Sequence, residues 1–226
     1  MQESTFAKRF TEIKPDFGLG QDFELVRELE TQAGIPDSLG ISCKDVKTLL
    51  DFMSKYPDIN LTNGYSQIIS QLYPRNFVEI DQIFSKTDLS KSYFDRHIQL
   101  LENKDLIERD IRNDSRIRLG ENFSIPELDI WTIEFKMSAW KSALKQAIRY
   151  RLFSSKVFVV MPSTKLEFVK KKEGIFKKFG IGLAFFDSAK GDLDIEVPPR
   201  KNVANAKSYY IDVIGRLSQS DKINFR

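Results

Sequence analysis

The segment from Asp129 to Pro162 constrains the fold more than any other part of this chain. It begins with the apolar run DIWTIEF, continues with helical spacing in KSALKQAIRYRLF, and ends with the uninterrupted apolar run KVFVVMP. Two buried strands joined by a helix of this length form a right-handed crossover, because the helix packs back onto the sheet. The sequence therefore predicts a mixed α/β fold whose sheet has parallel members.

Two opposite charges lie in the first of these predicted strands. Side chains alternate between the faces of a strand, so Glu134 and Lys136 point the same way and Asp129 points to the opposite face. Buried charges are costly unless they are paired or bind a ligand. This pair lies at the carboxyl end of the strand, where open α/β sheets bind their ligands. A structural ion pair and a ligand site both explain the strand taken alone.

Composition excludes several classes of protein. No apolar run approaches the length that crosses a bilayer, and the N-terminus lacks the apolar core of a secretory signal. The single cysteine, Cys43, excludes an internal disulfide and fits a reducing, cytoplasmic location. With only one histidine, His97, a zinc site is also disfavoured. Cys43 is better explained as a small residue at a helix start than as a nucleophile paired with His97. The net charge of +3 does not by itself indicate nucleic-acid binding.

The N-terminal part is predicted to be rich in helix. Residues 1–20 contain Pro15 and two glycines and are expected to form an arm or loop. Helical spacing runs over residues 21–33, and GIPDSLG then breaks it. A second helix is expected to begin at Ser42 or Lys44 and to end before Pro57.

The next segment shows a distinct order of elements. Short helices are predicted over residues 64–73 and 79–86, followed by a longer helix over 91–104. Two strands then surround an Asn113-Asp114 turn in DLIERDIRNDSRIRLG. This order resembles winged-helix DNA-binding domains, and the run LLENKDLIERD is similar to the helix end and first wing strand of that superfamily.

That resemblance implies that the third helix meets base edges or phosphates in the major groove and that the wing contacts the backbone. Winged helices also serve as protein–protein or spacer modules, which is the alternative for this segment. The DNA-binding residues that the resemblance implies are Lys91, Ser92, Tyr93 and Arg96 of the helix, and Arg112 and Arg116 of the wing.

The crossover segment carries a second resemblance. IEFK followed by W..AL.QA..Y...S..VFVVMP is similar to the PD-(D/E)xK nuclease superfamily, which has the restriction-endonuclease-like fold. The match covers residues 129–187, including GIGLAFFD, and is closest to the branch with a Gln-x-x-x-Tyr helix after the catalytic strand. It implies that Glu134 binds Mg²⁺ or Mn²⁺, that Lys136 positions or activates the attacking water, and that Gln146 and Tyr150 contact the phosphate or orient the site.

The superfamily also requires a second carboxylate on a neighbouring strand. Asp114 has suitable spacing, but it falls at the tip of the predicted wing. Asp129 is close in sequence but lies on the wrong face unless the strand begins after it. Glu127 and Asp110 are lesser candidates. Either the hairpin doubles as part of the nuclease core, or the core has lost its aspartate.

These observations divide the chain into three predicted parts: an N-terminal helical region (1–60), a winged-helix domain (61–122) and a restriction-endonuclease-like α/β domain (123–226). The expected function is a metal-dependent DNA phosphodiesterase, acting as a homodimer or within a DNA-processing assembly. The alternative is a non-catalytic DNA-binding regulator or assembly component with a degenerate nuclease fold. A protein-interaction module without a nucleic-acid role is the third reading.

Overall fold

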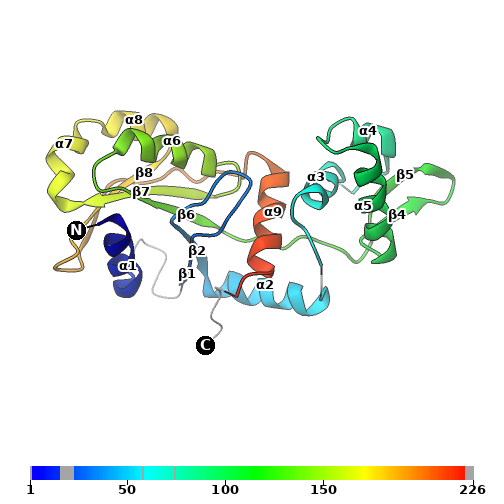
Figure 1. The fold of residues 1–226 in the computed structure, drawn as a ribbon, viewed down its shortest axis with the longest axis horizontal. Helices are drawn as coiled ribbons and strands as arrows, with labels where there is room; N and C mark the ends of the chain where they lie inside the picture. The colour runs from blue at the N-terminus through cyan, green and yellow to red at the C-terminus, as the bar shows by residue number, and fades with distance from the viewer. Residues whose placement is uncertain (1, 16–22, 58, 74, 222–226) are drawn as a thin grey trace.

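The structure is a computed structural model that describes residues 2–15, 23–57, 59–73 and 75–221. Its main feature is a mixed six-stranded sheet in the order β1-β2-β6-β7-β8-β9 (Figure 1). The three middle strands β6, β7 and β8 are parallel, and the remaining pairs are antiparallel. The mixed α/β class is therefore confirmed. The strands are β1 (Phe23–Arg27), β2 (Ser38–Ser42), β6 (Trp131–Phe135), β7 (Lys156–Pro162), β8 (Gly182–Phe186) and β9 (Leu193–Val197).

The predicted crossover is present. Helix α6 (Trp140–Tyr150) connects β6 to β7, and the two strands pair in parallel from Trp131 opposite Lys156. The apolar run of β7 is buried after its first residue. The sequence pattern was sufficient to predict these strands because both are covered on both faces, so both are mainly apolar and β7 is apolar after its first residue.

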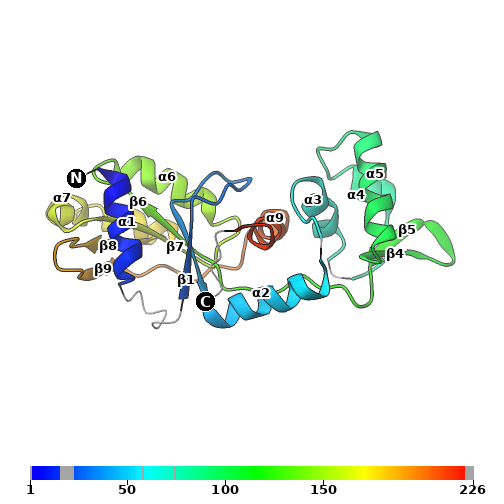
Figure 2. The same cartoon turned by 60° about the horizontal axis from the view of Figure 1, so that its bottom comes forward.

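Helix α1 (Glu3–Ile13) covers one face of the sheet (Figure 2). Its buried residues Phe6 and Phe10 pack edge-on against Phe135 of β6 and Phe186 of β8. The sequence predicts an arm or loop over residues 1–20, and the structure corrects this for residues 3–13. The apolar stripe of α1 is stable as a helix because the sheet buries it. Residues 16–20 lie outside the described part of the chain.

Helix α6 and the C-terminal helices lie on the opposite face of the sheet. They pack into a larger apolar core that also includes Tyr150, Val159 and Leu183. The helices beyond β7 are the 3-10 turn η1 (Ser163–Lys165), α7 (Leu166–Lys170), α8 (Glu173–Phe179) and α9 (Lys207–Ser218).

The N-terminal segment differs from the sequence prediction. Residues 23–27 form strand β1, although the sequence predicts a helix over 21–33. β1 pairs with β2, from Phe23 opposite Ser42 to Arg27 opposite Ser38, and β2 pairs in turn with β6. The first part of the chain is thus an edge of the main sheet rather than a separate helical region. Helix α2 (Cys43–Lys55) follows as predicted, with Ser42 as its N-cap.

A second lobe lies at one end of the molecule, beyond α2 and α9 (Figures 1 and 2). It has the order helix, strand, helix, helix, strand, strand, and its antiparallel sheet has the order β3-β5-β4. The predicted helices are confirmed, while the short strand β3 is additional. Asn113 pairs with Asp110, so the turn lies at residues 111–112. The elements are α3 (Gly64–Gln71), β3 (Val78–Glu79), α4 (Ile80–Phe84), α5 (Lys91–Asn103), β4 (Ile107–Asp110) and β5 (Asn113–Leu119).

Within the described ranges, no helix is both long enough and apolar enough to cross a membrane.

Candidate catalytic site

Glu134 is a buried carboxylate near the carboxyl end of β6. Its side chain is 1% exposed, and neither carboxylate oxygen has a hydrogen-bond partner among the described residues. Burial, followed by the negative charge of Asp37, raises the pKa of Glu134 to about 7, against the opposing effect of Lys136. A buried carboxylate without hydrogen bonds costs free energy, and this combination is typical of a site that binds a ligand.

Asp37 is the neighbouring carboxylate. It directly precedes β2, and because Ser38 pairs with Ile133, Asp37 falls opposite Glu134. Its Oδ2 accepts a hydrogen bond from the Phe135 N–H at 2.7 Å. Burial raises the pKa of Asp37, while the Phe135 N–H and the Lys136 ammonium oppose the rise. Two carboxylates of neighbouring strands therefore lie at the same edge of the sheet.

Lys136 completes this group. Its Nζ lies 3.2 Å from Glu134 Oε1 and 2.7 Å from Glu3 Oε1 at the start of α1. The contact with Glu134 is an ion pair without hydrogen-bond geometry, whereas the contact with Glu3 is a hydrogen bond. Burial acts to lower the pKa of Lys136, but the hydrogen bond to Glu3 and the charges of Glu134 and Asp37 raise it overall. The lysine is therefore held in its charged form.

Helix α6 supplies Tyr150 and Gln146. Tyr150 is fully buried, and its hydroxyl has no hydrogen-bond partner among the described residues. Burial raises the pKa of Tyr150 well above its usual range, and the negative charges of Glu134 and Asp37 add to the effect. Gln146 lies one turn earlier on the same face of the helix. The crossover helix thus brings the Tyr150 hydroxyl near the two carboxylates, with Gln146 on the same face of the helix.

The structure does not bring the other predicted metal ligands to this site. Asp114 is exposed on β5 in the second lobe, because its hairpin belongs to the small sheet. Asp129 precedes β6, and its side chain accepts a hydrogen bond from Ser155 at the other end of the strand. Asp110 forms an ion pair with Arg116, again in the second lobe. In the structure these three carboxylates therefore do not lie beside Glu134.

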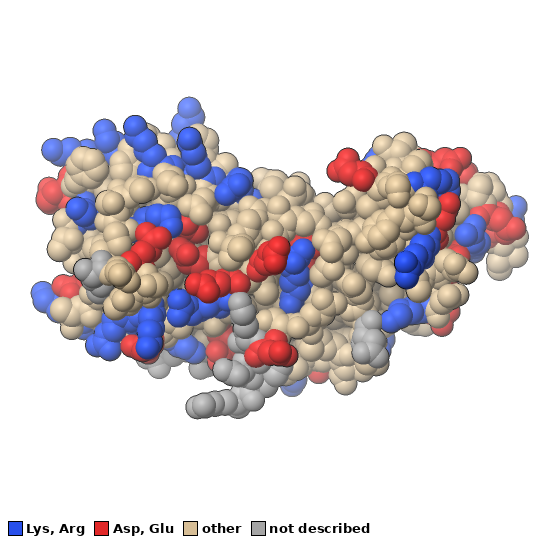
Figure 3. Space-filling model, in the orientation of Figure 1, with Lys and Arg blue, Asp and Glu red and all other residues tan. Residues whose placement is uncertain are grey.

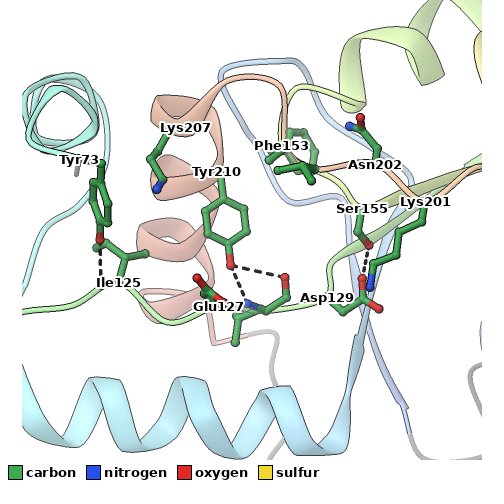
Figure 4. Close-up of a pocket in the computed structure, with 13 residues that line it drawn as sticks. Tyr73, Ile125, Glu127, Asp129, Phe153, Ser155, Lys201, Asn202, Lys207 and Tyr210 are labelled. Carbon is green, nitrogen blue, oxygen red and sulfur yellow. Dashed lines mark hydrogen bonds between the residues drawn. The ribbon is translucent and has the colours of Figure 1, made fainter.

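Asp129 and Glu127 instead line a cavity of about 430 Å³ between the segment before β6, the α6–β7 connection, residues 201–204 and α9 (Figure 4). The hydroxyl of Tyr210 accepts a hydrogen bond from the Leu128 N–H at 2.6 Å, and that of Tyr73 accepts one from the Ile125 N–H at 3.3 Å. These contacts fix the extended segment that leads from the second lobe into β6. Glu134 does not line this cavity.

The predicted DNA-binding residues all lie on the second lobe, and they differ in exposure and in whether an ion pair already holds them. Tyr93 is 42% exposed, and Ser92, Arg96 and Arg112 are also exposed. Lys91 forms an ion pair with Asp95 on the next turn of α5. Arg116 is held between Glu79 and Asp110. Arg96 and Arg112 are therefore the more available cations of this set.

Sequence reasoning missed Asp37 and Glu3. Asp37 lies in GIPDSLG, a segment whose proline and glycines indicate a turn, and it precedes Glu134 by far more than the expected spacing. Asp37 could have been found from the dipeptide Pro36-Asp37, which directly precedes the apolar run SLGIS. The letters of this dipeptide, PD, are those that begin the PD-(D/E)xK motif. Glu3 gave no signal, because its segment was expected to be an arm.

No protein-family model matches this chain, and no curated protein is significantly similar to it in sequence. In the part of the chain that the structure describes, no group of three or more His, Cys, Asp or Glu side chains is close enough to hold a metal ion. The site thus offers two carboxylates. The unsatisfied oxygens of Glu134 fit a hard divalent cation that takes its other ligands from water or phosphate.

Proposed function

We propose that this protein is a Mg²⁺- or Mn²⁺-dependent DNA phosphodiesterase of the restriction-endonuclease-like type. The observation that carries the proposal is the juxtaposition of Asp37, Glu134 and Lys136 where the neighbouring strands β2 and β6 begin and end, respectively. The resemblance in the sequence requires such a second carboxylate beside Glu-x-Lys. Asp37 meets that requirement, whereas the aspartates considered from the sequence do not.

The order of elements supports the proposal. Helix α1, strands β1, β2 and β6, helix α6 and strand β7 form one continuous unit of the sheet and its two covering layers. The second lobe is an insertion between β2 and β6. This insertion explains why the second carboxylate lies so far before Glu134 in the sequence.

The residues have distinct roles in this proposal. Asp37 and Glu134 would hold the divalent cation, which when bound supplies a water of lowered pKa and offsets negative charge on the phosphate. Lys136, kept charged, would orient the attacking water and stabilise negative charge that develops in the transition state. Glu3 positions Lys136 through its 2.7 Å hydrogen bond. Tyr150 and Gln146 would donate hydrogen bonds to the phosphate oxygens.

The second lobe is proposed to dock DNA as a winged helix. The order α3, β3, α4, α5, β4, β5 supports this role, as do the exposed Arg96 of α5 and Arg112 of the β4–β5 turn. In this arrangement the lobe supplies affinity, and the main sheet supplies the chemistry.

Cleavage of labelled DNA in Mg²⁺ tests the proposal. Asp37→Asn and Lys136→Ala should each lower the cleavage rate by about 100-fold or more, because each removes a charge needed in the transition state. Asp114→Asn is the matched control, since it removes a carboxylate from the second lobe and should leave the rate unchanged. Full activity in Asp37→Asn would contradict the proposed site. An inactive wild-type protein that still binds DNA would favour the non-catalytic alternative.

A further inference from the structure

One exposed face of helix α6 carries a row of basic side chains. Lys141, Lys145 and Arg149 are all exposed, and each follows the previous one by four residues. Residues four apart lie on the same face of a helix and are separated by about 6 Å along its axis. We call these three residues the α6 ridge.

The charge of the α6 ridge is not balanced within its own helix. The sequence of α6, WKSALKQAIRY, contains no aspartate or glutamate. Two other helices each pair one lysine with a carboxylate of the same helix, Lys91 with Asp95 in α5 and Lys177 with Glu173 in α8. Like charges four residues apart destabilise a helix, and Lys141 also lies in the first turn, where positive charge is unfavourable. An anion bound along the α6 ridge would relieve both effects.

The α6 ridge flanks the candidate catalytic site. Tyr150, whose pKa is raised by the nearby charges of Glu134 and Asp37, directly follows Arg149 of the ridge, and Gln146 directly follows Lys145, so these two residues form the adjacent row on the helix. Helix α8 lies beside the start of α6, where Trp140 and Phe176 are in ring contact at 6.2 Å. Figure 3 shows basic side chains along the upper edge of the main lobe, where Figure 1 places α6 and α8.

We propose that the α6 ridge binds the sugar–phosphate backbone of a nucleic-acid strand and leads that strand to the Glu134 site. The step of about 6 Å between ridge residues is close to the distance between neighbouring phosphates of one strand. The negative charges of a linear polyanion therefore complement the positive charges of the α6 ridge and have a similar spacing. Binding of such a polyanion would release counterions. The destination of the strand rests on the proposed function, whereas the binding of the backbone does not.

The test measures DNA affinity against salt concentration without any divalent cation. Fluorescence anisotropy would follow a short labelled single strand and the matching duplex in EDTA. Lys141→Ala/Lys145→Ala should weaken binding roughly tenfold at moderate salt and reduce the salt slope by about 1 to 2, as expected for the loss of two phosphate contacts. Arg149 is left unchanged because it adjoins Tyr150.

Lys44→Ala/Lys47→Ala is the matched control. It removes two exposed lysines from α2, a helix at a distance from α6 (Figure 1), and should leave the salt slope unchanged. Thermal melts of both variants would verify folding. An unchanged slope in the ridge variant, an equal loss in both variants, or no DNA binding by the wild type would each overturn the inference. Loss of metal binding or cleavage alone would overturn only the catalytic proposal.

Discussion

At the scale of single residues, the buried carboxylate of the candidate site lowers the stability of the folded state. Glu134 is buried between the apolar Ile133 and Phe135, and its carboxylate oxygens have no hydrogen-bond partner in the part of the chain that the structure describes. Burial and Asp37 raise its pKa to about 7 from an ordinary value of 4.5. The folded state therefore holds a proton that the unfolded chain releases at lower pH.

This shift predicts how Glu134→Gln changes stability. Below pH 4.5 the Glu134 carboxyl is protonated in both the folded and the unfolded state, so it does not change the free energy of unfolding. As the pH rises from 4.5 toward about 7, only the unfolded chain ionises, and the folded state becomes less stable relative to it. Glutamine does not ionise. At about pH 8, urea unfolding in EDTA should show Glu134→Gln to be more stable than the wild type by about 1–3 kcal/mol, and the gap should close near pH 4.5. A variant that is less stable at every pH would contradict this account.

At the scale of elements, α1 is held to the sheet by aromatic packing. Phe10 is fully buried, and its ring lies 4.9 Å from that of Phe135 and 5.0 Å from that of Phe186. Phe10→Ala should lower the free energy of unfolding by about 3–5 kcal/mol, because it leaves a cavity in this cluster. Phe168→Ala makes the same change at a side chain that is 62% exposed, and it should cost little. Equal losses in the two variants by urea unfolding would argue against the packing described.

Asp212 of α9 joins three elements that are distant in sequence. This fully buried carboxylate accepts hydrogen bonds from Asn63 N at 3.0 Å, from Gln32 Nε2 at 3.2 Å and from Arg216 Nε at 2.7 Å. Gln32 belongs to the β1–β2 connection that leads to Asp37, and Asn63 directly precedes α3 of the second lobe. Asp212 therefore ties the β1–β2 hairpin to the second lobe.

Asp212→Ala should destabilise the protein by about 3–5 kcal/mol in urea unfolding, since it leaves the buried partners unpaired. Hydrogen exchange should quicken both in residues 28–37 and around Asn63. Asp212→Asn keeps the shape and some hydrogen bonds and should lose less. Exchange that quickens in only one of these segments would contradict the link between them.

The elements also show what local sequence can predict. Helices α2 to α5 and the unit β6–α6–β7 follow from periodicity and caps, because their apolar stripes are local. The helical spacing of FELVRELE predicts a helix over the residues of β1. These residues form a strand instead because they pair with β2, which no local pattern shows. Glu134, Lys136, Gln146 and Tyr150 lie in one continuous segment, so the sequence predicts them together. Asp37 was not predicted, because it reaches Glu134 only through strand pairing across an inserted lobe.

At the scale of the whole molecule, the two lobes have different roles in the proposed function. If the second lobe docks DNA, Arg96→Ala and Arg112→Ala should each reduce the salt slope of DNA binding by about 1. Arg116→Ala should have a smaller effect, because Glu79 and Asp110 already hold Arg116. Anisotropy titrations over a range of salt concentrations would measure this. An unchanged slope in both Arg96→Ala and Arg112→Ala would remove this lobe from the DNA interface.

The central claim is that Asp37 and Glu134 form one metal site across β2 and β6. Calorimetric titration of Mn²⁺ into the wild type, Asp37→Asn, Glu134→Gln and Asp114→Asn tests it most directly. The account predicts that the wild type and Asp114→Asn bind alike and that the other two variants lose binding. Wild-type affinity should weaken as the pH falls through about 7, because Glu134 must lose its proton. Full Mn²⁺ binding by Asp37→Asn, or none by the wild type even with DNA present, would contradict the claim.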